Sequence, residues 1–112
     1  MSLSVYLSAI RETNVYSAKI THNLGKMAKQ VKVGKYSLYD YLWHPDALGL
    51  KVAGELILPL AVGLDILRKK PAKYKKLNSP NGWGIYEHFV LFVEKYLLAC
   101  TDNPDAKIEV SR

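Results

Sequence analysis

The feature that most constrains the fold is an apolar stripe near the C-terminal end of the chain. Its members recur in steps of three, one, three, one and three, and they are Phe89, Phe92, Val93, Tyr96, Leu97 and Cys100. These steps keep all six on one face of an α-helix, which turns once in about 3.6 residues. The stripe therefore predicts a core helix from about Trp83 to Thr101, ending before Asn103-Pro104.

A second stripe predicts another long helix earlier in the chain. Its apolar residues have the same helical spacing, and they are Ala53, Leu56, Ile57, Leu60, Leu64 and Leu67. Pro59 lies inside this pattern, and proline removes a backbone donor and crowds the preceding turn. We expect a kink at Pro59 or a break into two helices. Pro71 is suited to the first turn of a short basic helix through Lys76.

Two shorter helices are predicted in the first half of the chain. Thr21-His22-Asn23 offers N-cap chemistry before apolar residues at helical spacing, which are Leu24, Met27, Ala28 and Val31. We expect this helix to end near Gly34. A further short helix, Ser37 to Trp43, should stop before Pro45, because the residue preceding a proline avoids the α conformation.

Both ends of the chain alternate in a way that is typical of strands. In Ser4 to Ile10, Val5, Leu7 and Ala9 are predicted to share one face, and Tyr6, Ser8 and Ile10 the other. Lys107 to Ser111 also alternates. A two-stranded sheet is marginal alone, so it must pack on helices, recruit residues 14–20, or extend across a dimer. We predict one α+β domain over residues 1–112, mainly helical, with a small sheet formed by the N- and C-terminal strands.

Composition supports a globular chain and narrows the chemistry. The 112 residues are 49% hydrophobic and 23% charged, which suits one folded domain. The single cysteine, Cys100, belongs to the apolar stripe and is predicted to be a buried, inert thiol. The three histidines have no metal-site spacing and no catalytic signature is present. We therefore predict no catalytic residue, no metal and no cofactor.

Hydropathy argues against a membrane protein. The longest apolar run, Leu56 to Leu64, has nine residues, whereas a membrane helix needs about 20. The apolar N-terminal residues are not preceded by a basic region, so we predict no signal peptide and a cytoplasmic protein.

The chain has an excess of basic residues that is concentrated in two places. Sixteen Lys and Arg residues against ten Asp and Glu residues give a net charge of +6. Residues 68–76 contain six basic side chains and no acid, and residues 19–35 contain five lysines and no acid. Such clusters favour an anionic partner, whether nucleic acid, nucleotide or an acidic protein. The alternative is a solvated surface kept soluble by lysine, and the predominance of lysine over arginine favours it.

One candidate ligand site emerges from two polar, aromatic segments. In Asn81 to Tyr86, two glycines flank Trp83 at the predicted start of the last helix, where free N–H groups bind anions. The alternative is a tight turn in which Trp83 lies in the core. In Thr21-His22-Asn23, capping explains threonine and asparagine but does not require histidine.

We predict a site where these segments meet, with Trp83 and Tyr86 stacking on a base or ring. The candidate ligand-binding residues are His22, Asn23, Asn81, Gly82, Trp83, Tyr86, Lys73 and Lys76, with Lys75 also at the rim.

The chain also resembles a known family over nearly its whole length. The matching motifs are Ile20-Thr21-His22-Asn23-Leu24-x-x-Met27, Leu42-Trp43-x-Pro45, Asn81-Gly82-Trp83-Gly84-x-Tyr86 and Cys100-x-x-Asn103-Pro104-Asp105-Ala106. They are similar to those of small uncharacterised proteins from phage and bacterial genomes. The resemblance implies a cytoplasmic, phage-encoded accessory protein and nothing about a reaction type.

Three functions remain open on the sequence. The first is a non-enzymatic binding or interaction protein that forms a homo-oligomer or binds another protein or an anionic ligand. The second is a small enzyme or sequestering protein for a phosphate-containing small molecule. The third, nucleic-acid binding through the lysine clusters, has less support because no helix-turn-helix, zinc-finger or stacking-sheet motif accompanies the charge.

Overall fold

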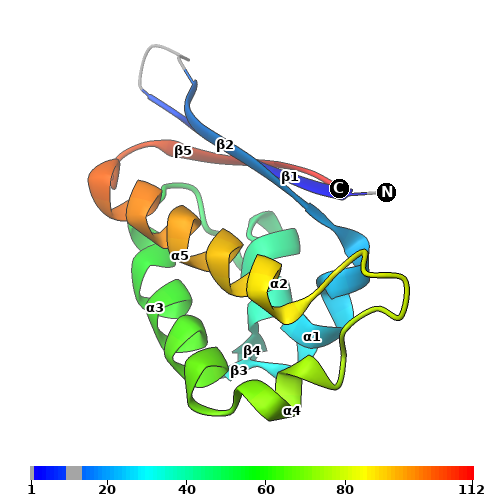
Figure 1. Ribbon diagram of the computed structural model, residues 1–112. Coiled ribbons are helices and arrows are strands. Elements are labelled where there is room, and N and C mark those ends of the chain that lie inside the picture. Colours follow the sequence, from blue (N-terminus) through cyan, green and yellow to red (C-terminus); the bar gives the residue numbers. More distant parts are fainter. Residues whose placement is uncertain (1, 10–13) are drawn as a thin grey trace.

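The terminal strands pair with each other, as predicted. A computed structural model describes residues 2–9 and 14–112 of the chain. Strand β1 (Ser2–Ser8) is central in an antiparallel sheet of order β2-β1-β5, between β2 (Asn14–Thr21) and β5 (Lys107–Ser111). The segment 14–20 is thus recruited into the sheet, which lies over the helices (Figure 1). Ile10, the last residue of the predicted N-terminal strand, lies outside the described residues.

The inner face of the sheet follows the alternation of β1. Leu3, Val5 and Leu7 are completely buried, and Tyr6 points to the other side. Leu7 is opposite Tyr16 of β2 and Ile108 of β5, so both outer strands also turn apolar side chains inward. Since side chains alternate along a strand, this register is the one that buries the apolar face.

The helices form the rest of the domain. They are α1 (Gly25–Gln30), α2 (Leu38–Trp43), α3 (Gly54–Lys69), α4 (Pro71–Lys75) and α5 (Tyr86–Asp102), with 3-10 turns η1 (His22–Leu24) and η2 (Asp46–Leu48). A small hairpin joins β3 (Lys32–Val33) to β4 (Tyr36–Ser37). The prediction of an α+β, mainly helical domain with a small sheet of terminal strands is confirmed.

Helices α3 and α5 supply much of the core, as their stripes predicted. Phe89, Val93 and Tyr96 of α5 are fully buried. Helix α3 is continuous through Pro59, so the predicted break into two helices is wrong. Leu56 and Leu60, on either side of the proline, both remain buried. Burying this uninterrupted stripe offsets the loss of the one hydrogen bond that proline cannot make.

Helix α5 begins at Tyr86 and not at Trp83 as predicted. Gly82 and Gly84 have φ angles of 77° and 121°, which a right-handed helix does not accommodate. Residues 76–85 therefore form an irregular loop, named the Trp83 loop from here on.

Helix α1 also ends earlier than predicted, at Gln30. Val31 adopts an extended conformation, and the chain then turns through Gly34, whose φ is 64°, to form the β3–β4 hairpin. Val31 is buried all the same, which explains why its spacing from Met27 and Ala28 resembled the continuation of a helix.

Other local signals have the predicted effect. Ser37 caps α2, and its side chain and that of Asp40 form a reciprocal capping box. Pro71 is the first residue of α4. Within the described residues, no helix is both long and apolar enough to cross a bilayer.

Candidate functional site

The Trp83 loop lies against the junction between β2 and α1, where the sequence predicted a site. The loop, yellow in Figure 1, is beside the segment that carries η1. The Asn23 side-chain Nδ2 donates a hydrogen bond of 2.7 Å to the Trp83 carbonyl oxygen. This contact joins positions sixty residues apart. The two predicted segments therefore meet.

Gly84 makes the close approach of the loop possible. A Cβ atom at this position would lie 2.9 Å from Asn23 Cβ and 3.3 Å from Thr21 Cγ2. Its φ of +121° is a conformation that other residues rarely adopt. Position 84 thus requires glycine for both reasons.

Trp83 is held by its backbone while its side chain faces solvent. Its N–H donates to Asn81 Oδ1 at 2.9 Å, and its carbonyl accepts from Asn23. Trp83 is nevertheless 72% exposed, so the alternative that it lies in the core is wrong. The core tryptophan is Trp43, which is only 3% exposed.

A groove of two adjoining pockets runs along this contact, and we call it the Trp83 groove. His22 and Asn23 line both pockets. The first, of about 920 Å³, adds Ser2, Lys19, Ile20, Thr21, Asn81 and Trp83. The second, of about 400 Å³, adds Lys26, Lys76, Leu77, Asn78, Ser79 and Pro80. Among the described residues, three lysines and no acidic side chain line the groove.

In the Thr21-His22-Asn23 segment, Thr21 caps the following turn, and His22 and Asn23 line both pockets of the groove. Thr21 Oγ1 accepts from the Asn23 N–H at 3.3 Å, which is the predicted cap. His22 takes no part in it, and its ring lies 6.1 Å from that of Trp43, between centroids. His22 Nε2 is buried and has no hydrogen-bond partner among the described residues.

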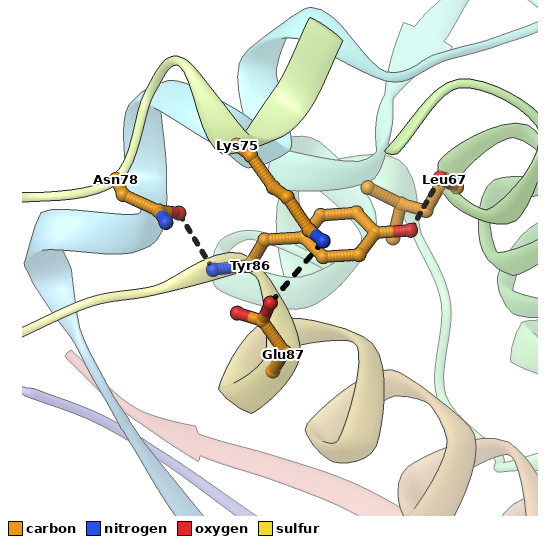
Figure 2. Close-up of polar contacts among 5 residues, drawn as sticks. All are labelled: Leu67, Lys75, Asn78, Tyr86 and Glu87. Carbon is orange, nitrogen blue, oxygen red and sulfur yellow. Dashed lines mark hydrogen bonds and ion pairs between the residues drawn. The ribbon is translucent and has the colours of Figure 1, made fainter. Parts of the chain in front are cut away.

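Tyr86 lines neither pocket of the groove, and its ring extends toward Leu67 (Figure 2). Its hydroxyl donates to the Leu67 carbonyl at 2.7 Å, and its N–H donates to Asn78 Oδ1 at 2.8 Å. The ring is buried, and burial raises the pKa of the hydroxyl. Tyr86 therefore fastens α5 to the end of α3 and does not present its ring to a ligand.

Replacing Tyr86 with phenylalanine is expected to lower the free energy of unfolding by about 1 kcal/mol, because it removes one buried hydrogen bond. Ligand affinity should not change. Urea denaturation and a binding titration of the same variant check both parts. A loss of affinity without a loss of stability would assign Tyr86 to the ligand instead.

The three lysines predicted at the rim of the site do not lie together. Lys76 lines the groove, whereas Lys73 lies with its Nζ 5.4 Å from the Tyr74 ring centroid. Lys75 pairs with Glu87 at 3.5 Å and lies over the Tyr86 ring (Figure 2). Lys19 and Lys26 were missed as site residues. Their signal was the acid-free run over residues 19–35, which the sequence indicated only as a charge cluster.

Three of the backbone N–H groups in the predicted anion site donate to internal partners. The N–H of Gly82 donates to the Ser79 carbonyl at 3.1 Å, and those of Trp83 and Tyr86 donate to asparagine side chains. The positive charge that lines the groove is that of three lysine side chains.

Cys100 is buried in α5 and lies away from the groove. Burial raises the pKa of its thiol to about 12, so the thiol stays protonated near neutral pH and is a weak nucleophile. In the part of the chain that the structure describes, no three His, Cys, Asp or Glu residues cluster as metal ligands would.

Comparison of the chain with protein-family models, with curated proteins and with solved structures finds no match.

Proposed function

We propose that this protein is a binding protein whose Trp83 groove holds a phosphate-bearing ligand with an aromatic ring. The observation that carries the proposal is Trp83 itself. Its backbone is fixed on both sides by asparagine side chains, while the indole remains in solvent. Exposure of so large an apolar ring costs stability that a core position would recover. Because the backbone that carries the ring is held before binding, less conformational entropy is lost when a ligand stacks on it.

The lysines of the groove supply the complementary charge. Some basic side chains elsewhere form ion pairs, such as Lys69 with Asp65, Lys75 with Glu87 and Arg68 with Glu94, whereas others, such as Lys35 and Lys95, form none with a described residue. The three groove lysines, which are Lys19, Lys26 and Lys76, form no ion pair with any described residue. Unpaired positive charge in a concave site attracts anions, and a nucleotide combines an anionic phosphate with an aromatic base.

The alternative of a small enzyme acting on a phosphate-containing molecule uses the same groove. It requires a group that transfers a proton within hydrogen-bond reach of the ligand. Besides the lysines, His22 is the groove side chain of that type, and its Nε2 is buried. This placement favours binding or sequestration over catalysis. A phage origin, a cytoplasmic location and a homo-oligomeric state stay predictions.

Calorimetric titration with mononucleotides, cyclic dinucleotides and single-stranded DNA at low salt tests the proposal. Stacking of a base on an aromatic ring contributes about 1–3 kcal/mol, so Trp83→Ala is expected to weaken binding by about 5- to 150-fold. Trp83→Phe should retain most of the affinity. Leu98→Ala is the matched control, because it removes another exposed apolar side chain far along α5. Absence of binding at millimolar concentration, or equal affinity of Trp83→Ala and wild type, would refute the proposal.

A further inference from the structure

We infer that the ligand is a single-stranded nucleic acid, with its phosphates along the groove and one base stacked on Trp83. This inference rests on the proposed function and adds the class of ligand. It follows from three properties of the groove, which are its size, the distribution of its lysines and the exposure of its tryptophan.

The groove is larger than one nucleotide requires. Pockets that bind drug-sized molecules measure about 300–1,000 Å³. Each of the two adjoining pockets lies in that range, at about 920 and 400 Å³. Because His22 and Asn23 line both, a ligand that passes over them contacts the two pockets at once. A chain of nucleotides has this extended shape.

The lysines are distributed between the two pockets. Lys19 belongs to the pocket of Trp83, whereas Lys26 and Lys76 belong to the other. A chain with regularly spaced phosphates offers an anion to each group, whereas a mononucleotide offers one phosphate to the whole groove. Lysine contacts phosphate as a point charge without the forked geometry that reads base edges, so we expect little sequence preference.

The exposed indole selects single strands over duplexes. In a duplex the bases are already stacked on both faces, and an aromatic side chain gains contact only when a base is freed. In a single strand a base face is available to Trp83 at much lower cost. A basic groove beside an exposed aromatic ring is the arrangement that sequence-tolerant single-strand binding proteins use.

A titration series monitored by tryptophan fluorescence tests this inference. The ligands are thymidine monophosphate, oligothymidylates of about four, eight and twelve nucleotides, and a duplex of about twelve base pairs, which span the site sizes of known single-strand binding modules. Trp83 is the exposed reporter and Trp43 is buried, so quenching on binding comes mainly from Trp83. We expect affinity to rise at least tenfold from the mononucleotide to the length that occupies the groove, and the duplex to bind at least tenfold more weakly.

The salt dependence of the affinity tests whether the groove lysines contact the phosphates of the ligand. Each phosphate neutralised on a single strand contributes about 0.7 to the log–log slope of affinity against salt. Lys26→Gln combined with Lys76→Gln is expected to reduce the slope for the longest oligonucleotide by about 1.4, while mononucleotide affinity changes little. Lys95→Gln, on the exposed face of α5, is the control and should leave the slope unchanged.

The outcomes separate this inference from the function on which it rests. If the mononucleotide binds as tightly as the longest oligonucleotide, or the duplex as tightly as the single strand, the single-strand inference is overturned and the proposed function stands. If none of these ligands binds and the calorimetric titrations are also negative, both are overturned.

Discussion

Replacing Phe92 with alanine is expected to lower the free energy of unfolding by about 3–5 kcal/mol, the usual cost of truncating a buried phenylalanine. Phe92 is 7% exposed, and its ring centroid lies 6.0 Å from that of Tyr96. Tyr96 in turn stacks on Tyr16 of β2 at 5.9 Å. The alanine variant therefore leaves a cavity in the layer that joins α5 to the sheet.

The midpoint of chemical denaturation measures this effect. Leu98→Ala is the control on the same helix, because Leu98 is 61% exposed and exposed substitutions change stability by about 0.5 kcal/mol or less. An unchanged midpoint for Phe92→Ala would mean that the α5 stripe does not form the core.

The second large effect is expected at Gly84. In Gly84→Ala the new Cβ overlaps Asn23 Cβ and the backbone keeps a φ of +121°. Such strain costs about 1–3 kcal/mol, and overpacking costs a comparable amount. The loop is expected to move away from η1, which breaks the Asn23–Trp83 hydrogen bond and lowers ligand affinity to the level of Trp83→Ala.

Gly82→Ala is the matched control for this prediction. Gly82 also has a positive φ, of +77°, but among the described residues nothing beyond its two chain neighbours lies within 4 Å of a Cβ placed there. It should lose only about 1 kcal/mol, the cost of a left-handed conformation, and keep its affinity. Equal stability and affinity of the two alanine variants would show that close approach at position 84 does not shape the site.

The elements that the sequence predicted correctly are those set by local periodicity. The stripe from Phe89 to Cys100 and the alternation of Val5 and Leu7 each indicate one face of one element, and both faces are buried. The predicted boundaries of the helices were less accurate than the predicted faces. Helix α5 begins at Tyr86 because Gly82 and Gly84 take positive φ angles, a choice that depends on how the loop packs against Asn23.

The candidate site was predictable in position but not in detail. Glycines around Trp83 and the unexplained His22 pointed to the two segments that meet. The orientation of the side chains depends on contacts distant in sequence, such as Tyr86 with Leu67 and Asn23 with Trp83. Local patterns carry no information about such pairs. For the same reason, the sequence placed Tyr86 in the site and left out Lys19 and Lys26.

The most direct test of the Trp83 groove is the response of the two indole N–H signals in a nitrogen–proton correlation spectrum during titration with single-stranded DNA. Trp83 lies in the groove and Trp43 in the core, so one spectrum contains both the reporter and its reference. We expect the Trp83 indole signal and the Asn23 side-chain amide signals to shift progressively with ligand, while the Trp43 indole shifts much less. Shifts confined to another surface, or none at saturating DNA, would contradict the assignment of the groove as the binding site.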